Sequence, residues 1–335
     1  MKKLIAIAVV VLAASIAHAQ TPAPLVVGTG NFFSPIVSDL DKAIVFYRDG
    51  LGLDVGAPAN ADTNAGLRNM FGLPDAQLHW AVGRPPAMRT GVEIVEIKKV
   101  ESKPAERRMQ DPGAFTLLVL VRDVDAAFAK VKATGAPVVT TGGAPMNVGM
   151  ARAVVVKDPD GHFVEIVRPN PLPETTAPET ANVIGVRIRL TVDDAEKSLH
   201  LYRDILGMPQ VAEDTRDFRH SDEVSAMMGM KGSQYRVRSV TAPATGLRVE
   251  FIDYKDIDRR TVRANIQDPG STRMQLQVRD VDATIAALKA AGGTVVSTGG
   301  TTAELPGRGG ATTKVAIVRD PNNLFLVLIQ AAPRP

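Results

Sequence analysis

The stretch VSDLDKAIVFYRDGLG, residues 37–52, returns as VDDAEKSLHLYRDILG, residues 192–207, and this repetition decides how the chain is organised. In both copies a strand-like alternation ends at an aspartate, and apolar residues then recur at helical spacing as far as a closing glycine. Aspartate suits this junction because its carboxylate accepts hydrogen bonds from the free amides of the first helical turn. The stretch therefore predicts a strand followed by an amphipathic helix.

Shorter motifs extend the repeat in the same order along the chain. QDPG occurs at 110–113 and 267–270, and VRDVDA occurs at 121–126 and 278–283. The second motif again places an aspartate between a strand and a helix, so the chain contains this junction four times. Further short strands are expected after each helix, near 76–83, 91–98, 150–157 and 162–168 and at their counterparts in the second copy. The pattern predicts four βαβββ units, two in each copy.

The first 19 residues have the pattern of an export signal. Lys2 and Lys3 precede an apolar run from Leu4 to Ile16, and Ala-His-Ala at 17–19 has the form of a cleavage site. The apolar run is shorter than the about 20 residues that cross a bilayer. We therefore expect a signal peptide at 1–19 and a periplasmic or secreted protein that keeps no membrane contact after cleavage.

The composition excludes several classes of site. The chain has 335 residues, with 39 Lys and Arg against 36 Asp and Glu, five histidines and no cysteine. Without cysteine there are no disulfides, thiolate metal sites or cysteine nucleophiles. A nucleic-acid surface needs concentrated positive charge and stacking aromatics, whereas the net charge is +3 and aromatic residues make up 4% of the chain. We expect no nucleic-acid partner.

Four βαβββ units, with the ending Tyr-Arg-x-x-Leu-Gly after the first helix of each copy, resemble the vicinal oxygen chelate superfamily. This superfamily includes glyoxalase I, bleomycin-resistance proteins and extradiol dioxygenases. The resemblance implies an α+β fold of two tandem glyoxalase-like domains, each with two βαβββ modules that form cup-shaped mixed β-sheets with helices on the outside. We place the first domain at 25–170, a proline-rich linker at 171–182 and the second domain at 183–331.

The resemblance also implies a metal ion held by the first, fourth, fifth and last strands of a domain. In that strand order, the positions carry Phe32, Glu96, Thr116 and Glu165 in the first domain and Arg187, Glu250, Arg273 and Val327 in the second. Arginine cannot coordinate a cation, and two carboxylates alone suit only a hard ion such as Mg²⁺ or Ca²⁺ with water ligands. We therefore predict a degenerate metal site and no cofactor, with Glu96 and Glu165 as the remaining candidates for a divalent metal.

Strand alternation predicts two cups of different chemistry. Phe32 and Thr116 lie among apolar positions in the first domain. The cup of the second domain is basic and hydrogen-bonding, with Arg187, Arg189, Glu250, Arg273 and Gln275. Converging arginines bind carboxylates through paired hydrogen bonds, so we hypothesise that the second cup binds an anionic or carboxylate-bearing small molecule. The alternative is a solvated sheet face whose arginines are neutralised by Glu250 and nearby acids.

His79 is the remaining candidate for a ligand-binding residue. It lies in the strand-like stretch QLHWAV at 77–82, where it could act as an acid–base group in a pocket, or be an ordinary packed or surface histidine.

The sequence favours an exported protein of this superfamily that binds or sequesters a small molecule, as a monomer or homodimer. One alternative is a metal-dependent glyoxalase-like lyase or an extradiol-type dioxygenase, and another is a non-catalytic interaction protein. Whether the chain is an enzyme is left open, and no catalytic residue or substrate is identified.

Overall fold

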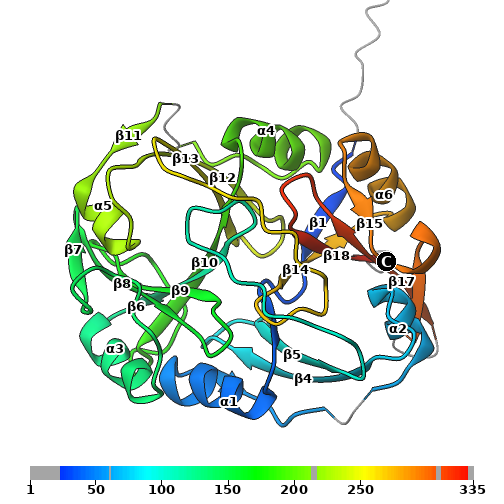
Figure 1. Ribbon diagram of the computed structural model, residues 1–335, viewed down its shortest axis with the longest axis horizontal. Helices are drawn as coiled ribbons and strands as arrows, with labels where there is room; N and C mark the ends of the chain where they lie inside the picture. Colours follow the sequence, from blue (N-terminus) through cyan, green and yellow to red (C-terminus); the bar gives the residue numbers. More distant parts are fainter. Residues whose placement is uncertain (1–22, 60–61, 213–216, 307–310, 331–335) are drawn as a thin grey trace, which may run out of the picture.

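The computed structural model describes residues 23–59, 62–212, 217–306 and 311–330, so the expected signal peptide lies outside the described residues. The first copy of the repeat forms two units (Figure 1). The first unit contains β1 (Val26–Thr29), β2 (Ser34–Val37), α1 (Leu40–Val45) with a π-helical continuation (Phe46–Gly50), β3 (Asp54–Val55), α2 (Ala65–Phe71), β4 (Gln77–Arg84) and β5 (Val92–Lys98). The second contains β6 (Phe115–Val121), α3 (Val124–Ala133), β7 (Met146–Val148), β8 (Ala151–Lys157) and β9 (Phe163–Arg168).

The second copy repeats this order of elements. The third unit contains β10 (Val183–Thr191), α4 (Ala195–Leu199) with a π-helical continuation (His200–Ile205), β11 (Arg219–His220), α5 (Asp222–Met227), β12 (Gln234–Thr241) and β13 (Arg248–Lys255). The fourth contains β14 (Thr272–Val278), α6 (Val281–Ala290), β15 (Thr294–Val295), a 3₁₀ turn (Thr298–Gly300), β16 (Ala303–Pro306), β17 (Thr312–Arg319) and β18 (Phe325–Gln330). The predicted fold class, α+β with mixed cup-shaped sheets and outer helices, is confirmed.

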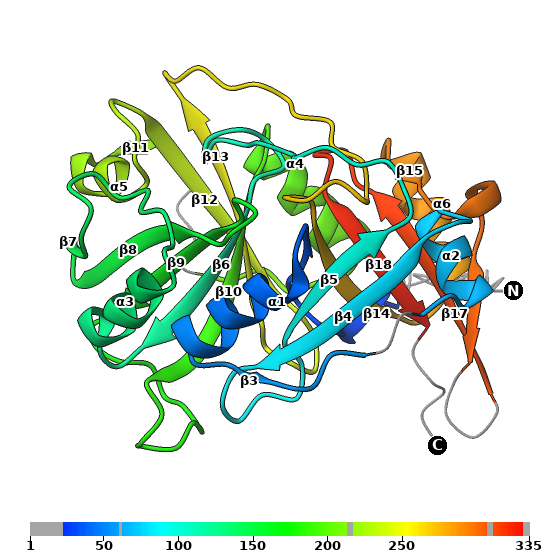
Figure 2. The ribbon, with the colours of Figure 1, turned by 60° about the horizontal axis from the view of Figure 1, so that its bottom comes forward.

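Each of the two sheets combines one unit from each copy. One sheet has the order β15-β17-β18-β14-β2-β5-β4-β3 and joins units four and one, with β1 on β14 and β16 on β17. The other has the order β11-β12-β13-β10-β6-β9-β8-β7 and joins units three and two. The sheets lie side by side, each curved around its own concave face (Figures 1 and 2). We call the concave face of units one and four cup 1 and that of units two and three cup 2.

This pairing corrects the expectation that each cup is built within one half of the chain. The first strands pair antiparallel across the halves, with Arg189 beside Thr116 and Arg273 beside Ser34. This pairing could not be predicted from the sequence, because the first strands of all four units are similar and each has an edge that could pair with another unit. The expected contrast between an apolar cup and a basic cup is therefore wrong, since the arginines of the second half are divided between the two cups.

Two long connections carry the chain between the sheets. Residues 99–114 lead from β5 to β6, and residues 256–271 lead from β13 back to β14. They meet where the backbone N–H of Ala105 donates to the carbonyl of Pro269 at 2.7 Å. The two connections thereby link one sheet to the other.

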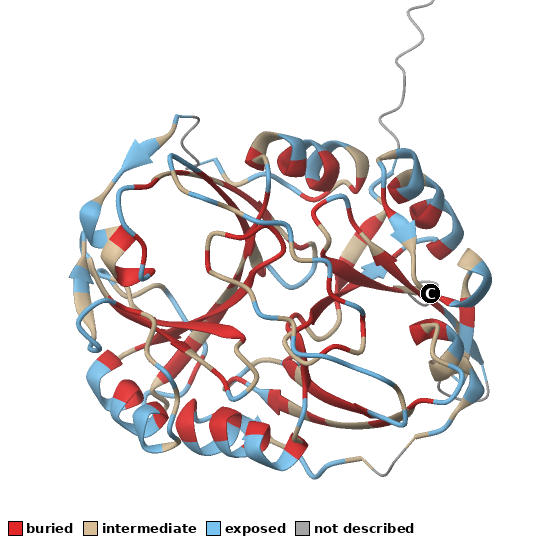
Figure 3. Cartoon of the chain, in the orientation of Figure 1, coloured by how far each residue is buried: buried red, intermediate tan, exposed pale blue. Residues whose placement is uncertain are grey.

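Four helices, α1, α3, α4 and α6, begin as the sequence predicts and cover the convex faces of the sheets. At each of the four predicted junctions the aspartate accepts a hydrogen bond from a backbone N–H of the first turn: Asp39, Asp123, Asp194 and Asp280. The inner sides of these helices are buried and their outer sides exposed (Figure 3). Among the described residues, no helix is long and apolar enough to cross a membrane.

Candidate functional site

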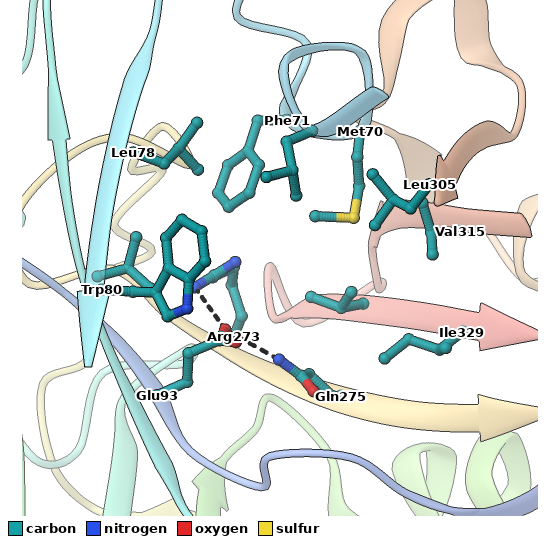
Figure 4. Close-up of a pocket in the computed structure, with 13 residues that line it drawn as sticks. Met70, Phe71, Leu78, Trp80, Glu93, Arg273, Gln275, Leu305, Val315 and Ile329 are labelled. Atoms are coloured by element: carbon teal, nitrogen blue, oxygen red, sulfur yellow. Dashed lines mark hydrogen bonds and ion pairs between the residues drawn. The ribbon is translucent and has the colours of Figure 1, made fainter. Parts of the chain in front are cut away.

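Cup 1 encloses a cavity of about 230 Å³ with mostly apolar walls (Figure 4). The walls come from α2, the β16–β17 hairpin and strands β4, β5, β14 and β18. The lining residues are Leu67, Met70, Phe71, Leu78, Trp80, Glu93, Val95, Arg273, Gln275, Leu305, Val315, Val327 and Ile329. An apolar enclosure with a few polar groups gathered at one place is typical of sites for small organic molecules.

The polar end of this cavity is built from Arg273, Glu93 and Gln275. Arg273 is 1% exposed, and its Nη2 donates to Glu93 Oε2 at 3.3 Å. Its guanidinium carbon lies 4.7 Å from the centre of the Phe71 ring, within the range of a cation–π contact. Burial lowers the pKa of Arg273, and the charge of Glu93 opposes that shift. Within the described part of the chain, the buried Nε of Arg273 has no hydrogen-bond partner, so the polar end keeps an unused donor.

Gln275 is held in place from two sides. Its Nε2 donates to Glu93 Oε2 at 2.9 Å (Figure 4). Its Oε1 accepts from the backbone N–H of Asn31 at 2.8 Å. The second contact depends on Gly30, where an added Cβ would lie 2.4 Å from Gln275 Oε1. The break between β1 and β2 therefore lets the backbone approach Gln275 closely and orients the polar end of the cavity.

Cup 2 contains a second cavity, of about 250 Å³, with more charged groups in its lining. The lining residues are Val148, Ala151, Ala153, Glu165, Val167, Arg189, Arg219, Val224, Met227, Met228, Tyr235, Val237, Arg248, Glu250 and Ile252. Helix α5 and strands β7 and β8 form its apolar side, and β9, β10 and β13 supply most of the charged side. The two cavities thus have related positions in the fold but different chemistry.

Arg189 bridges two carboxylates in cup 2. Its Nη1 donates to Glu165 Oε2 at 2.5 Å, and its Nε donates to Glu250 Oε2 at 2.9 Å. The three side chains are only 13%, 5% and 6% exposed, respectively. Burial by itself disfavours the charged guanidinium, but the charges of Glu165 and Glu250 outweigh it and raise the pKa of Arg189 further. This triad is a fixed and permanently charged part of the cup.

Two further arginines lie around Glu250. Arg248 Nε is 3.4 Å and Arg187 Nη1 is 3.8 Å from Glu250 Oε1. The pKa of Arg187 is lowered because burial, together with the positive charges of Arg248 and Arg189, outweighs the attraction of Glu250. The side chain of Arg187 is nevertheless 34% exposed, so its contact with Glu250 is weaker than that of Arg189.

These residues do not fit a metal ion. In cup 2 the two carboxylates converge on a guanidinium, which cannot act as a ligand, and in cup 1 the carboxylate of Glu93 faces Arg273 and Gln275. Over the described ranges, no three or more His, Cys, Asp or Glu residues form a group that could hold a metal ion. Iron, nickel and zinc sites are built from such sets of converging donors, often with imidazole or thiolate ligands.

The structure brings some predicted site residues together and separates others. Arg187, Arg189, Glu250, Thr116 and Glu165 share cup 2, where Thr116 is buried beside Arg189. Arg273 and Gln275 lie in cup 1. The prediction that the arginines of the second half converge in a single cup is therefore wrong.

Three predicted residues do not face a cavity. Phe32 is fully buried within the central hydrophobic core. Glu96 and His79 are cross-strand neighbours on the convex side of the sheet, opposite to Val95 and Trp80, and Glu96 pairs with Lys98 at 3.0 Å. The expected cup position of Glu96 is wrong because the assumed register was one residue off, which sends a side chain to the other face. That of Phe32 is wrong because β2 begins only at Ser34, so Phe32 precedes the strand and does not follow its alternation.

The sequence reasoning missed Glu93, Trp80 and Phe71. Glu93 is the structural counterpart of Glu250, since each stands the same number of residues before its QDPG motif. That spacing was the signal that could have identified it. Helix α2, which brings Phe71 over Arg273, follows a cap at Asn64 that accepts hydrogen bonds from two backbone N–H groups. It was not predicted, because a helix of seven residues has a weak sequence pattern.

Comparisons with known proteins agree with this architecture. Glyoxalase I from Zea mays is similar in structure, with a TM-score of 0.58 and 17% identity over 90% of this chain and 92% of that chain. A protein from Bacillus subtilis that is named as a candidate dioxygenase gives a TM-score of 0.53 and 14% identity over 93% of this chain and 87% of that chain. At such identities the likeness concerns the fold.

Sequence comparison identifies the family directly. No curated protein matches the chain. The family model described as Glyoxalase/Bleomycin resistance protein/Dioxygenase superfamily matches residues 31–166 and again residues 185–328, which together make up most of the chain. The chain therefore belongs to the Glyoxalase/Bleomycin resistance protein/Dioxygenase superfamily, with two tandem copies of its domain.

Proposed function

We propose that the protein binds a small organic molecule in cup 1 without a metal ion, and that this ligand has an apolar body and one hydrogen-bond acceptor group. The observation that carries the proposal is the buried Arg273, whose Nε has no partner in the described chain, at the end of an otherwise apolar cavity. Leaving a buried donor unpaired is unfavourable, and an acceptor on the ligand would remove that cost.

The charges at the polar end limit the kind of acceptor. Glu93 lies 3.3 Å from Arg273 and balances its charge, so the cavity does not demand a full negative charge on the ligand. The apolar side chains of Phe71, Leu78 and Val327 then favour an aromatic or branched aliphatic body. A monocarboxylate or a ketone on such a body satisfies both requirements, whereas a highly charged molecule does not.

The fluorescence of Trp80 provides the test, because Trp80 lines cup 1 and the chain has 1 tryptophan. Benzoate, acetophenone and toluene share one ring but carry an anionic acceptor, a neutral acceptor and no acceptor. We expect benzoate and acetophenone to change the Trp80 emission in a saturable way and to bind more tightly than toluene. Replacing Arg273 by methionine is expected to weaken the binding of both acceptor ligands about tenfold or more, towards the toluene value.

Arg187→Met is the matched control, since it removes an arginine at a similar strand position in cup 2. It is expected to leave the titrations of cup 1 unchanged. The proposal fails if none of the three ligands alters the emission, or if the two arginine variants have equal effects. Metal analysis of the purified protein separates the proposal from a metal-dependent lyase or dioxygenase: stoichiometric Fe, Zn, Ni or Mn in cup 1 would contradict it.

A further inference from the structure

We infer that Glu165 and Glu250 form a cation site in cup 2, and that the chain fills this site with its own guanidinium, from Arg189, in place of a divalent metal ion. The inference concerns a different cavity from the proposed ligand site and does not depend on it. It assigns to Arg189 an electrostatic role that a bound ion would otherwise have, and it predicts a metal site that opens when Arg189 is removed.

The geometry of the triad supports this role. Nε and Nη2 of Arg189 both lie 2.9 Å from Glu250 Oε2, and Nη1 lies 2.5 Å from Glu165 Oε2. The carboxylates come from β13 and β9, which flank the central β10–β6 pair on opposite sides. All three nitrogens of the Arg189 guanidinium therefore face carboxylate oxygens. Through them Arg189 connects unit three, which contains Glu250, to unit two, which contains Glu165.

The surroundings of the carboxylates distinguish the triad from a surface ion pair. Glu165 and Glu250 are 5% and 6% exposed, so their charges need a counter-charge close by. Arg248 and Arg187 approach Glu250, and Arg189 is the ion-pair partner of Glu165. Without Arg189, two nearly buried carboxylates would line a cavity of about 250 Å³ that can also admit water. Carboxylate and water oxygens are the ligands that hard divalent cations take.

Titration of the full-length protein with Mn²⁺, followed by calorimetry and electron paramagnetic resonance, tests the inference. The wild-type protein is expected to bind no Mn²⁺ in cup 2. Arg189→Ala and the milder Arg189→Gln are expected to bind one Mn²⁺ per chain, at least about tenfold more tightly than any binding by the wild-type protein. The same Mn²⁺ should raise the melting temperature of the variants and leave that of the wild type unchanged.

Two matched variants locate the ion. Arg187→Gln removes an arginine two positions away on the same strand and is expected to gain no Mn²⁺ affinity, because Arg187 does not contact Glu165. Adding Glu165→Gln to Arg189→Ala should abolish the new site. The inference is overturned if the folded Arg189 variants bind Mn²⁺ no more tightly than the wild type, or if wild-type cup 2 already binds it stoichiometrically.

Circular dichroism shows which variants have folded. If neither Arg189 variant folds, nuclear magnetic resonance of the arginine Nε–H groups in the wild-type protein decides instead. Excess Mn²⁺ should leave the Arg189 signal sharp, since its site is filled, and paramagnetic broadening of that signal would overturn the inference.

Discussion

Replacing Arg189 by methionine is expected to lower the free energy of unfolding by about 3–5 kcal/mol, because it leaves Glu165 and Glu250 buried without their shared cation. Methionine keeps most of the volume of the side chain, so the loss reports on charge rather than on packing. Urea denaturation at neutral pH measures it.

Neutralising the carboxylates provides the control for this prediction. In the Arg189→Met background, adding Glu165→Gln and Glu250→Gln should recover most of the lost stability, because a buried ion cluster can often be replaced by neutral groups without loss. Arg187→Met should cost less than about 1 kcal/mol, since its contact with Glu250 is longer and its side chain is 34% exposed. Equal losses in the Arg187 and Arg189 variants would contradict the account of cup 2.

Local sequence patterns predicted the units of this fold correctly. The four aspartate caps and the strands near 76–83, 91–98, 150–157 and 162–168 appear within about one residue of their expected positions, as β4, β5, β8 and β9. These features are set by neighbours in the sequence: an aspartate meets the amides of the next turn, and alternation marks a strand with one buried face. The sequence of a single unit is therefore enough to predict its helix caps and strands.

The pairing of units could not be predicted in the same way. The first strands of all four units have similar patterns, so a sheet of units one and two would look as acceptable as one of units one and four. The choice depends on contacts between distant segments, such as the crossing of Ala105 and Pro269. For that reason the residues of the charged site were identified while their grouping was not: Glu165 belongs with Arg189 and Glu250, although it comes from the other half of the chain.

A buried histidine between the units has a further role that its sequence position did not reveal. His162 Nδ1 lies 2.8 Å from Asp158 Oδ2, and its Nε2 lies 3.1 Å from the carbonyl oxygen of Ser271, which directly precedes β14 of the fourth unit. Both partners are acceptors, so a ring that satisfies both carries a proton on each nitrogen. Burial opposes that charge, but the carboxylate of Asp158 outweighs it and raises the pKa of His162. The imidazolium therefore joins unit two to unit four.

The corresponding aspartate in the second copy has no such partner. Leu324 occupies the position of His162, and its backbone N–H donates to Asp320 Oδ1 just as that of His162 donates to Asp158 Oδ1, both at 2.9 Å. Burial there raises the pKa of Asp320 to about 6, despite hydrogen bonds from Tyr202 and the backbone. The leucine variant of His162 thus reproduces an arrangement that the fold already contains, and steric failure is not expected.

His162→Leu is expected to lower the free energy of unfolding by about 3 kcal/mol near pH 6, because it removes one partner of a buried ion pair. A histidine whose pKa is raised by folding contributes stability that is complete below the unfolded value of about 6.5 and is lost as the pH rises through the folded value. Urea denaturation from pH 4 to 10 should therefore show the largest difference between wild type and variant at pH 4–6.5 and a smaller one at alkaline pH.

His200→Leu is the matched control: the Nδ1 of His200 also lies 2.8 Å from an aspartate, Asp204, but the histidine side chain is 66% exposed. Screening by water limits that pair to less than about 0.5 kcal/mol, so two ion pairs of equal length should differ severalfold in stability, and a His162 difference that grows with pH would contradict the imidazolium.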